Sequence, residues 1–454
     1  MGMRTIDAIK PVNLINLIEF LRSKLWDPDF VARSRMREQD FTRQRQLTFP
    51  VMMLFILQKT VKSLQRHLHE FLDELAGGGV FDPVSAGAFT HARAKLKHSA
   101  FIELNEGTVV PWIYSSEQAQ SVNRWRGHRL LGVDSSLLRL PNSAELREQF
   151  HLVEVNNQSG KTGTSYPEAR MLVIYDLLNG VGIDGRLERG ERGEVGLAIE
   201  QLRKASKGDV MINDRGFTGY CYLAWHRHLG LHFIARCSRG SFAAAQELFR
   251  KNRGAESLLV KLLAPLEERA ALRELGLALE LVVRFVSVRL PNGELEVLAT
   301  SLLNEQQYPT EEFLEVYHYR WEHETFYNVL KARLDLENFS GQTAEAVRQD
   351  FYATLLLCNL ETVLVGGTNA ELQKESSEHK NRKQVNEAVA FHAIKEELIE
   401  LLYSNTPVEQ VVEKLQRLFR GCPVSVRPER KWPRGKASLH RGYHFQRRVR
   451  KIVF

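Results

Sequence analysis

The chain has 454 residues, of which 43% are hydrophobic and 26% charged, and its formal net charge is +7. This composition is typical of a globular protein with several domains and excludes a long disordered chain. The charge is uneven, because residues 420–454 contain eleven Lys or Arg and one acid, Glu429, which gives this tail +10 and the rest of the chain −3. Aromatic residues alternate with these cations, which favours binding to nucleic-acid phosphates and bases. A solvated basic tail is the alternative. The predicted DNA contacts of the tail are Arg430, Lys431 and Arg434.

Two features of the sequence indicate the cellular compartment. The longest aliphatic run, VMMLFIL after Pro50, is far shorter than the ~20 residues that cross a bilayer, and no signal-peptide pattern is present. The cysteines form no C-x-x-C pair, which predicts free thiols in a reducing compartment. We therefore expect a cytoplasmic protein without membrane contact.

Residues 1–125 are predicted to form a helical N-terminal domain that binds DNA, with helices near 12–25, 47–75 and 86–105 and a glycine break at 76–80. The stretch SAGAFTHARAKLKHSAF starts with a potential cap at Ser85 and places Arg93, Lys95 and Lys97 on a short helix after a turn. A helix that reads a DNA groove has this pattern, and Arg93 and Lys95 are its predicted DNA contacts. An ordinary helical hairpin is the alternative.

Strands dominate from about residue 126 to 237. HRLLGVDSSLLRL is an apolar run broken by Asp134, and ARMLVIYDLLNGVGIDGRL is typical of a hairpin turning at Asn179 and Gly180. A helix, the strand GDVMIN before Asp214, another helix and the strand LHFIARC follow. The order β-β-β-α-β-α-β predicts an α/β fold in which helices connect parallel strands.

The remaining segments are predicted in the same way. Residues 238–303 form a β-rich insertion, with a hairpin at Pro291-Asn292-Gly293. Residues 304–370 return to the core with a long helix, and residues 371–454 form a basic helical region for DNA or dimer contacts. A polar linker is expected at 366–380.

The helix predicted over EVYHYRWEHETFYNVLKARLDLE carries a polar stripe. At helical spacing Tyr317, Arg320, Glu324 and Lys331 project from one narrow face. Apolar residues occupy the opposite side, so we expect the stripe to point outward from an amphipathic helix. The simplest alternative is that Arg320 and Glu324 form an ordinary surface ion pair.

Asp134 and Asp214 occupy comparable places in two predicted strands. If these strands are parallel neighbours, their carboxylates meet at one edge of the sheet, where Glu324 would complete a hard-oxygen site for Mg²⁺ or Mn²⁺. Two such metals can promote in-line displacement at phosphorus. Ordinary turn chemistry is the alternative for each aspartate. Asp176 and Asp184 are the acids most easily mistaken for ligands, and solvated turns are their expected setting.

These motifs resemble the DDE-class bacterial insertion-sequence transposases that carry a Tyr-x2-Arg-x3-Glu-x6-Lys signature. The spacing of Tyr317, Arg320, Glu324 and Lys331 matches it at every position. DRGFTGY, which starts at Asp214, looks like the second-aspartate motif, and GVDSSLLRLP resembles the first-aspartate segment. The resemblance covers roughly residues 40–450.

The resemblance implies an RNase H-like mixed sheet flanked by helices and interrupted by a β-rich insertion domain. It implies that Asp134, Asp214 and Glu324 bind divalent metals, two in each active site, and that Tyr317, Arg320 and Lys331 contact the DNA end. Arg215 would also face phosphate. The implied activity is cleavage at the inverted-repeat ends of an insertion sequence and transfer of the 3′-hydroxyls into target DNA by a homodimer. A domesticated DNA-binding protein and a nuclease without strand transfer are the alternatives.

One feature departs from some relatives, which stack a flipped base on a tryptophan of the insertion domain. This chain has no Trp between residues 238 and 300. A base platform, if used, would be another residue such as Phe242 or Phe285. The departure bears on a hairpin intermediate and leaves cleavage and strand transfer unaffected.

Overall fold

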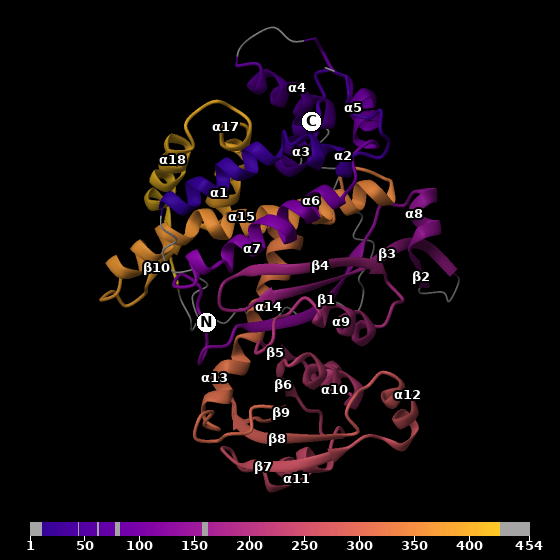
Figure 1. Cartoon of the computed structure of the whole chain (residues 1–454), viewed down its shortest axis with the longest axis vertical. Coiled ribbons are helices and arrows are strands. Elements are labelled where there is room, and N and C mark those ends of the chain that lie inside the picture. The colour runs from indigo at the N-terminus through magenta and orange to yellow at the C-terminus, as the bar shows by residue number, and fades with distance from the viewer. Residues whose placement is uncertain (1–10, 44, 61–62, 78–81, 157–161, 427–454) are drawn as a thin grey trace.

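The computed structural model describes residues 11–43, 45–60, 63–77, 82–156 and 162–426. Helices from both ends of the chain form the upper part of Figure 1, and a long mixed sheet runs below them. The tail residues Arg430, Lys431 and Arg434 lie outside the described residues.

The N-terminal region is helical, as predicted, but its helices are shorter than expected. The predicted helix over 47–75 is interrupted, since Lys59 leaves the helical region with φ 1° and ψ 111°. The predicted helix over 86–105 ends at Arg93, so Lys95 and Lys97 lie in the connection to the next helix. The helices are α1 (Pro11–Lys24), α2 (Pro28–Ser34), α3 (Phe49–Gln58), α4 (Leu64–Leu75), α5 (Ala86–Arg93), α6 (Ser99–Leu104), the π-helix η1 (Asn105–Val109), α7 (Val110–Ile113) and the 3₁₀-helix η2 (Ser116–Gln118).

One mixed sheet organises the rest of the chain. Its order is β2-β3-β1-β5-β6-β9-β8-β7, with β4 also paired to β3. β1 is antiparallel to β3 and parallel to β5, and β5 is parallel to β6, which confirms the predicted α/β class. The strands are β1 (Leu130–Arg139), β2 (His151–Asn156), β3 (Thr162–Asp176), β4 (Val181–Arg189), β5 (Val210–Asn213), β6 (His232–Arg236), β7 (Ser257–Leu263), β8 (Glu280–Arg289) and β9 (Leu295–Thr300).

Helices connect these strands. The helix α9 connects β4 to β5, and α10 connects β5 to β6, in the crossover arrangement that parallel strands require. The connecting helices are α8 (Ala144–Gln149), α9 (Glu194–Leu202), the 3₁₀-helix η3 (Arg215–Phe217), α10 (Tyr220–Leu229), α11 (Ala243–Lys251), the 3₁₀-helix η4 (Leu266–Glu268) and α12 (Arg269–Glu274).

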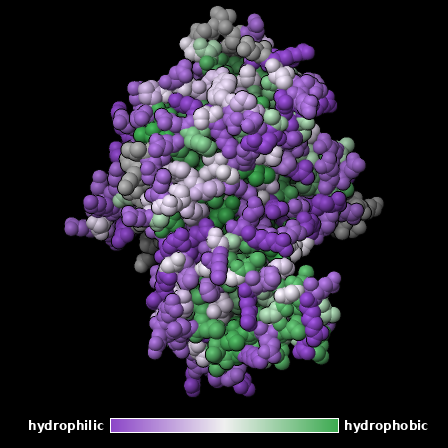
Figure 2. All heavy atoms as spheres, in the orientation of Figure 1, coloured by the Kyte–Doolittle hydropathy of each residue, from purple (hydrophilic) through white to green (hydrophobic). Residues whose placement is uncertain are grey.

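The strands within residues 238–303 continue the same sheet, because β9 pairs with β6 through Ile234 and Thr300. β8 and β9 form the hairpin predicted around Pro291-Asn292-Gly293, where Gly293 adopts a φ of 87° that favours glycine. Apolar side chains are prominent on the lower surface in Figure 2, where these strands lie. The exposed large apolar residues of this segment are Leu259, Leu263, Leu266, Leu275, Val282 and Leu303.

The chain then returns through α13 (Glu312–His318), α14 (Arg320–Asn328) and the π-helix η5 (Val329–Arg333) to the long helix α15 (Ala344–Glu375). The polar linker predicted at 366–380 is wrong for residues 366–375, because α15 continues through Gly366 and Gly367 to Glu375, with Val365, Thr368 and Leu372 buried along it. Packing of this face outweighs the low helix propensity of glycine. Residues 376–380 are turns and bends. The C-terminal elements are β10 (Lys383–Val385), α16 (Glu387–Glu396), α17 (Leu398–Leu402), α18 (Val408–Gly421) and β11 (Pro423–Ser425).

Among the described helices, α15 alone is long and apolar enough to cross a membrane, and 89% of its apolar window is buried inside the protein. Cys221, Cys237, Cys358 and Cys422 are free thiols, as predicted.

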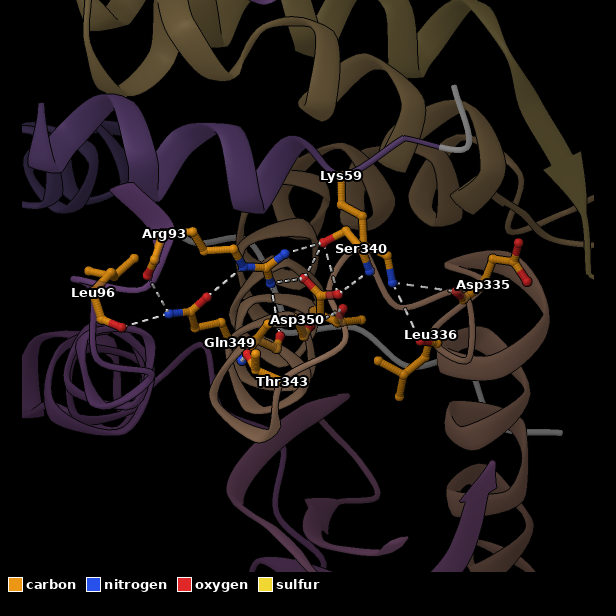
Figure 3. A network of polar contacts seen from close by, with 11 residues as sticks. Lys59, Arg93, Leu96, Asp335, Leu336, Ser340, Thr343, Gln349 and Asp350 are labelled. Atoms are coloured by element: carbon orange, nitrogen blue, oxygen red, sulfur yellow. Dashed lines mark hydrogen bonds and ion pairs between the residues drawn. The ribbon is translucent and has the colours of Figure 1, made fainter. Parts of the chain in front are cut away.

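A buried polar network joins α5 to α15 (Figure 3). The Arg93 guanidinium donates to Asp350 Oδ1 and Gln349 Oε1, each at 2.7 Å, and also to Ser340 Oγ. Arg93 is only 4% exposed. The prediction that Arg93 contacts DNA is therefore not supported, since this buried side chain links α5 to α15 inside the protein. The local sequence pattern showed a cation after a turn. It could not show that this cation pairs with Asp350, which is 257 residues away in the chain.

Replacing Asp350 by Asn leaves the Arg93 guanidinium buried without a counter-charge, and we expect it to lower the free energy of unfolding by about 3–5 kcal/mol at neutral pH. Burial alone raises the pKa of Asp350, but the charges of Arg93 and Lys59 and hydrogen bonds from Ser340 bring it below its ordinary value. The stabilisation is therefore complete above the unfolded-state pKa of about 3.9 and is lost as the pH falls through the lower folded-state pKa. Urea denaturation as a function of pH measures it.

The matched control is Glu70→Gln, which removes an exposed ion pair with Arg66 at 2.9 Å on α4. We expect this change to cost less than about 0.5 kcal/mol. Equal losses in the two variants would contradict the stabilising role of the buried network.

Candidate active site

Asp134 and Asp214 occupy equivalent positions on neighbouring parallel strands. β1 pairs with β5 in a register that matches Gly132 to Ile212, and each aspartate lies two residues further along. β5 pairs with β6 in a register that matches Asn213 to Ala235, so Arg236 continues the row. The carboxyl ends of parallel strands are where open α/β sheets bind ligands. The structure therefore confirms that β1 and β5 are parallel neighbours, and their register places Asp134 and Asp214 side by side at the edge of the parallel-paired region.

Burial raises the pKa of Asp134 to about 6, and the charges of Asp214 and Glu194 raise it too, whereas the Ser135 N–H and the charge of Arg320 lower it. Asp214 follows β5 and caps η3, where its Oδ1 accepts the Arg215 N–H at 2.7 Å. A partly desolvated carboxylate within the field of a second one favours a cation at this edge.

The predicted polar stripe does not point outward throughout. Tyr317 is 5% and Arg320 8% exposed, so the prediction is wrong for these two residues. They are buried because α13 packs on β8 and the helices cover the sheet edge. Burial alone lowers the pKa of Arg320, but Tyr317, Asp214 and Glu324 raise it above its ordinary value.

Arg320 interacts with all three predicted carboxylates: it forms an ion pair with Glu324, and its charge acts on Asp134 and Asp214. Arg320 Nη2 donates to Glu324 Oε1 at 3.0 Å, and the Glu324 side chain is 37% exposed. Within the described part of the chain, no group of three His, Cys, Asp or Glu side chains is arranged to hold a metal ion. The structure thus brings Asp134 and Asp214 together and directs Glu324 to Arg320. Lys331, on η5, donates to Leu137 O of β1 at 2.6 Å.

Tyr327 connects α14 to the residue that carries the first carboxylate. Its hydroxyl donates to Asp134 O at 2.5 Å and accepts the Val173 N–H at 3.2 Å. Close packing beside this contact requires Gly132, because a Cβ there would lie 3.0 Å from both His323 Nδ1 and Leu177 Cδ2. Neither Tyr327 nor Gly132 was singled out from the sequence, because their roles depend on a contact between distant segments.

Arg236 and Glu296 are further residues that the sequence analysis missed. Arg236 Nη2 lies 2.8 Å from Glu296 Oε1. Burial raises the pKa of Glu296, and the charges of Arg236 and Arg320 oppose this rise. The Tyr317 hydroxyl is buried near this pair without a hydrogen-bond partner among the described residues. The sequence did contain one signal for Arg236. Arg236 lies at the end of the predicted strand LHFIARC, which follows the strand before Asp214 in the chain.

Other predicted residues lie elsewhere. Asp176 and Asp184 are 0% and 2% exposed, so the expectation of solvated turns is wrong. Asp176 accepts hydrogen bonds from Tyr114 and Asn179, and Asp184 accepts one from Gln201. Both are structural residues in the sheet and its turn.

Phe285 is fully buried, with its ring 5.4 Å from that of half-buried Phe242, so of these two residues Phe242 is the better candidate for a base platform. Arg215 is exposed beside Asp214. Lys95 is half-buried and lines a cavity of about 630 Å³ in the N-terminal region, together with Arg43, Arg45 and His91.

This edge of the sheet lies inside a known domain, because the transposase DDE domain family matches residues 125–360. The chain belongs to this family. It is 23% identical over 368 residues to transposase InsG for the insertion sequence element IS4 of Escherichia coli (strain K12), which covers 77% of this chain and 78% of that protein. The piggyBac transposase in a synaptic complex with hairpin DNA matches with a TM-score of 0.42 and 11% identity, covering 90% of this chain and 85% of the other. This protein is therefore a DDE-class DNA transposase.

Replacing Tyr327 by Phe in this transposase removes a buried donor to Asp134 O and leaves the Val173 N–H unpaired. We expect a loss of about 1–3 kcal/mol in unfolding stability and reduced DNA cleavage, because the Asp134 backbone is then held less firmly. Denaturation and cleavage assays measure the two effects. The control is Tyr220→Phe, which removes a hydroxyl bonded to Ala278 O at 3.0 Å, away from Asp134. Equal cleavage by the two variants at matched stability would contradict a role at the site.

Proposed function

We propose that this transposase cleaves DNA at the inverted-repeat ends of an insertion sequence and transfers the 3′-hydroxyl ends into target DNA. Asp134, Asp214 and Glu324 are the catalytic, metal-binding side chains of this proposal. The observation that carries it is the register of β1 and β5, which aligns the two aspartates at the carboxyl edge of the sheet.

The residues present fit Mg²⁺ or Mn²⁺. Carboxylate oxygens are the ligands that these hard cations prefer, and a cation would offset the burial and repulsion that raise the pKa of Asp134. Two metal ions, when bound, activate a water or a 3′-hydroxyl and stabilise the leaving oxygen. Asp134 and Asp214 would hold them, with Glu324 as the third carboxylate.

Arg320 gives the site a way to respond to DNA. Its guanidinium is bound by Glu324 in the DNA-free protein. A DNA phosphate competes for the same donors, since guanidinium groups bind phosphate and carboxylate alike. Arg320 would therefore hold the DNA end while the Glu324 carboxylate becomes available to the metal.

Further residues are proposed to bind DNA. Tyr317, Lys331 and exposed Arg215 lie near the catalytic edge, Lys95 lies in the cation-lined cavity of the N-terminal region, and the basic tail would add nonspecific phosphate contacts. The units of this proposal are the N-terminal DNA-binding domain (1–125), the core (126–237 and 304–370), the insertion domain (238–303) and the C-terminal region (371–454). A cytoplasmic homodimer would pair the two ends.

The test uses an end-labelled duplex from the DNA that flanks the reading frame, incubated with protein and Mg²⁺ or Mn²⁺. We expect cleavage at an inverted-repeat boundary, its loss when metal is removed, and a decrease of more than about 100-fold in Glu324→Gln with DNA binding retained. Glu315→Gln, an exposed position on α13, is the matched control. Equal, uncut binding by wild type and Glu324→Gln would indicate a DNA-binding protein without catalysis. Cleavage without joining of the 3′ ends to a second duplex would indicate a nuclease.

A further inference from the structure

A polar cluster lies behind Asp134, on the opposite face of β1, and comprises Ser135, Arg170 and Glu194. Ser135 Oγ donates to Glu194 Oε1 at 2.5 Å and accepts from Arg170 Nη1 at 2.8 Å. Arg170 also forms an ion pair with Glu194 and donates from Nη2 to Gly190 O at 3.1 Å. The three side chains come from β1, β3 and the first turn of α9, so they tie these elements together.

This cluster is linked to Asp134 through one peptide unit. The Ser135 N–H donates to Asp134 Oδ1 at 2.8 Å. The carbonyl of the same peptide, Asp134 O, accepts the Tyr327 hydroxyl at 2.5 Å. Tyr327 of α14 binds the carbonyl of this peptide, and Glu194 of α9 binds the Ser135 side chain. Because the peptide is planar, these two contacts set the direction of the Ser135 N–H that binds the Asp134 carboxylate.

Glu194 Oε1 accepts hydrogen bonds from both Ser135 and Arg170. Ser135 projects from the face of β1 opposite to Asp134, because successive side chains of a strand alternate. Glu194 therefore contacts the residue behind Asp134, and within the described residues it belongs to no group of three side chains that could hold a metal ion. The side chain of Arg170 is 15% exposed and that of Glu194 is 44% exposed, so water reaches the Glu194 end of these charge-assisted contacts. The hydrogen bonds of Ser135 and Arg170 nevertheless tie β1, β3 and the start of α9 together.

We propose that Ser135, Glu194 and Arg170 are positioning residues that orient the Asp134 carboxylate for its metal. The inference rests on the proposed function, in which Asp134 binds a divalent cation. None of the three touches DNA or metal in this scheme, and they act through the Asp134–Ser135 peptide. Residues that orient metal ligands in this way typically change metal affinity or activity by about 10- to 100-fold when replaced.

The test measures Mn²⁺ binding to the full-length, DNA-free protein by titration calorimetry, with thermal unfolding measured in parallel. We expect Ser135→Ala and Glu194→Ala each to weaken Mn²⁺ binding by about 10- to 100-fold. The double variant should be no weaker than the weaker single variant, because both substitutions break the same connection. Ser135→Thr keeps the hydroxyl and should restore binding.

Glu200→Ala is the matched control, because Glu200 lies on the same helix and binds Arg192 at 2.7 Å without appearing among the charges that act on Asp134. It should bind Mn²⁺ as the wild type does. Ser135→Ala removes a single hydroxyl and leaves the Arg170–Glu194 pair in place, so a folding defect in Glu194→Ala does not prevent the test.

The outcomes separate the two proposals. If Asp134→Ala loses Mn²⁺ binding while Ser135→Ala keeps wild-type affinity, the positioning role is wrong and the metal site stands. If Ser135→Thr binds as weakly as Ser135→Ala, the hydroxyl contact is not the cause and the inference is overturned. If Asp134→Ala binds Mn²⁺ as the wild type does, the metal site of the proposed function is itself wrong.

Discussion

The parallel pairing of β1 with β5 is the constraint on which the site depends. It extends over three residue pairs, from Leu130 and Val210 to Gly132 and Ile212. A slip of one residue would turn the Asp134 side chain to the other face of the sheet, away from Asp214. All of these strand residues are buried, so the hydrophobic core specifies the register. The alignment of Asp134 with Asp214 is therefore a consequence of core packing.

The second constraint is the close approach of α14 to this edge. Tyr327 bonds to the backbone of Asp134, and His323 packs against β1 where Gly132 leaves room. Together they bring Arg320 within the field of both aspartates while its guanidinium bonds to Glu324.

The N-terminal region is built onto the core by interior polar contacts. Arg93 reaches Asp350 at the start of α15, and Gln349 returns a hydrogen bond to Leu96 O at 2.6 Å. Breaking such a buried pair is costly because an uncompensated charge remains inside the protein. These contacts also explain why Arg93, which the sequence pattern predicted to bind DNA, instead stabilises the fold.

The sequence alone established the family and the fold class, because the motifs and the order of the elements carry them. The segments around Asp134 and Asp214 and the spacing of Tyr317, Arg320, Glu324 and Lys331 resemble the DDE transposases, and the order of strands and helices predicted the α/β class. The tertiary structure decided which polar groups are exposed and which are paired. Three contacts depend on where elements pack against each other. They are the buried ion pair of Arg93 with Asp350, the hydrogen bond of Tyr327 to Asp134 O, and the pairing of Glu324 with Arg320 on a helix that covers the sheet edge. Periodicity describes one element at a time, and so it cannot show what that element meets in the folded chain.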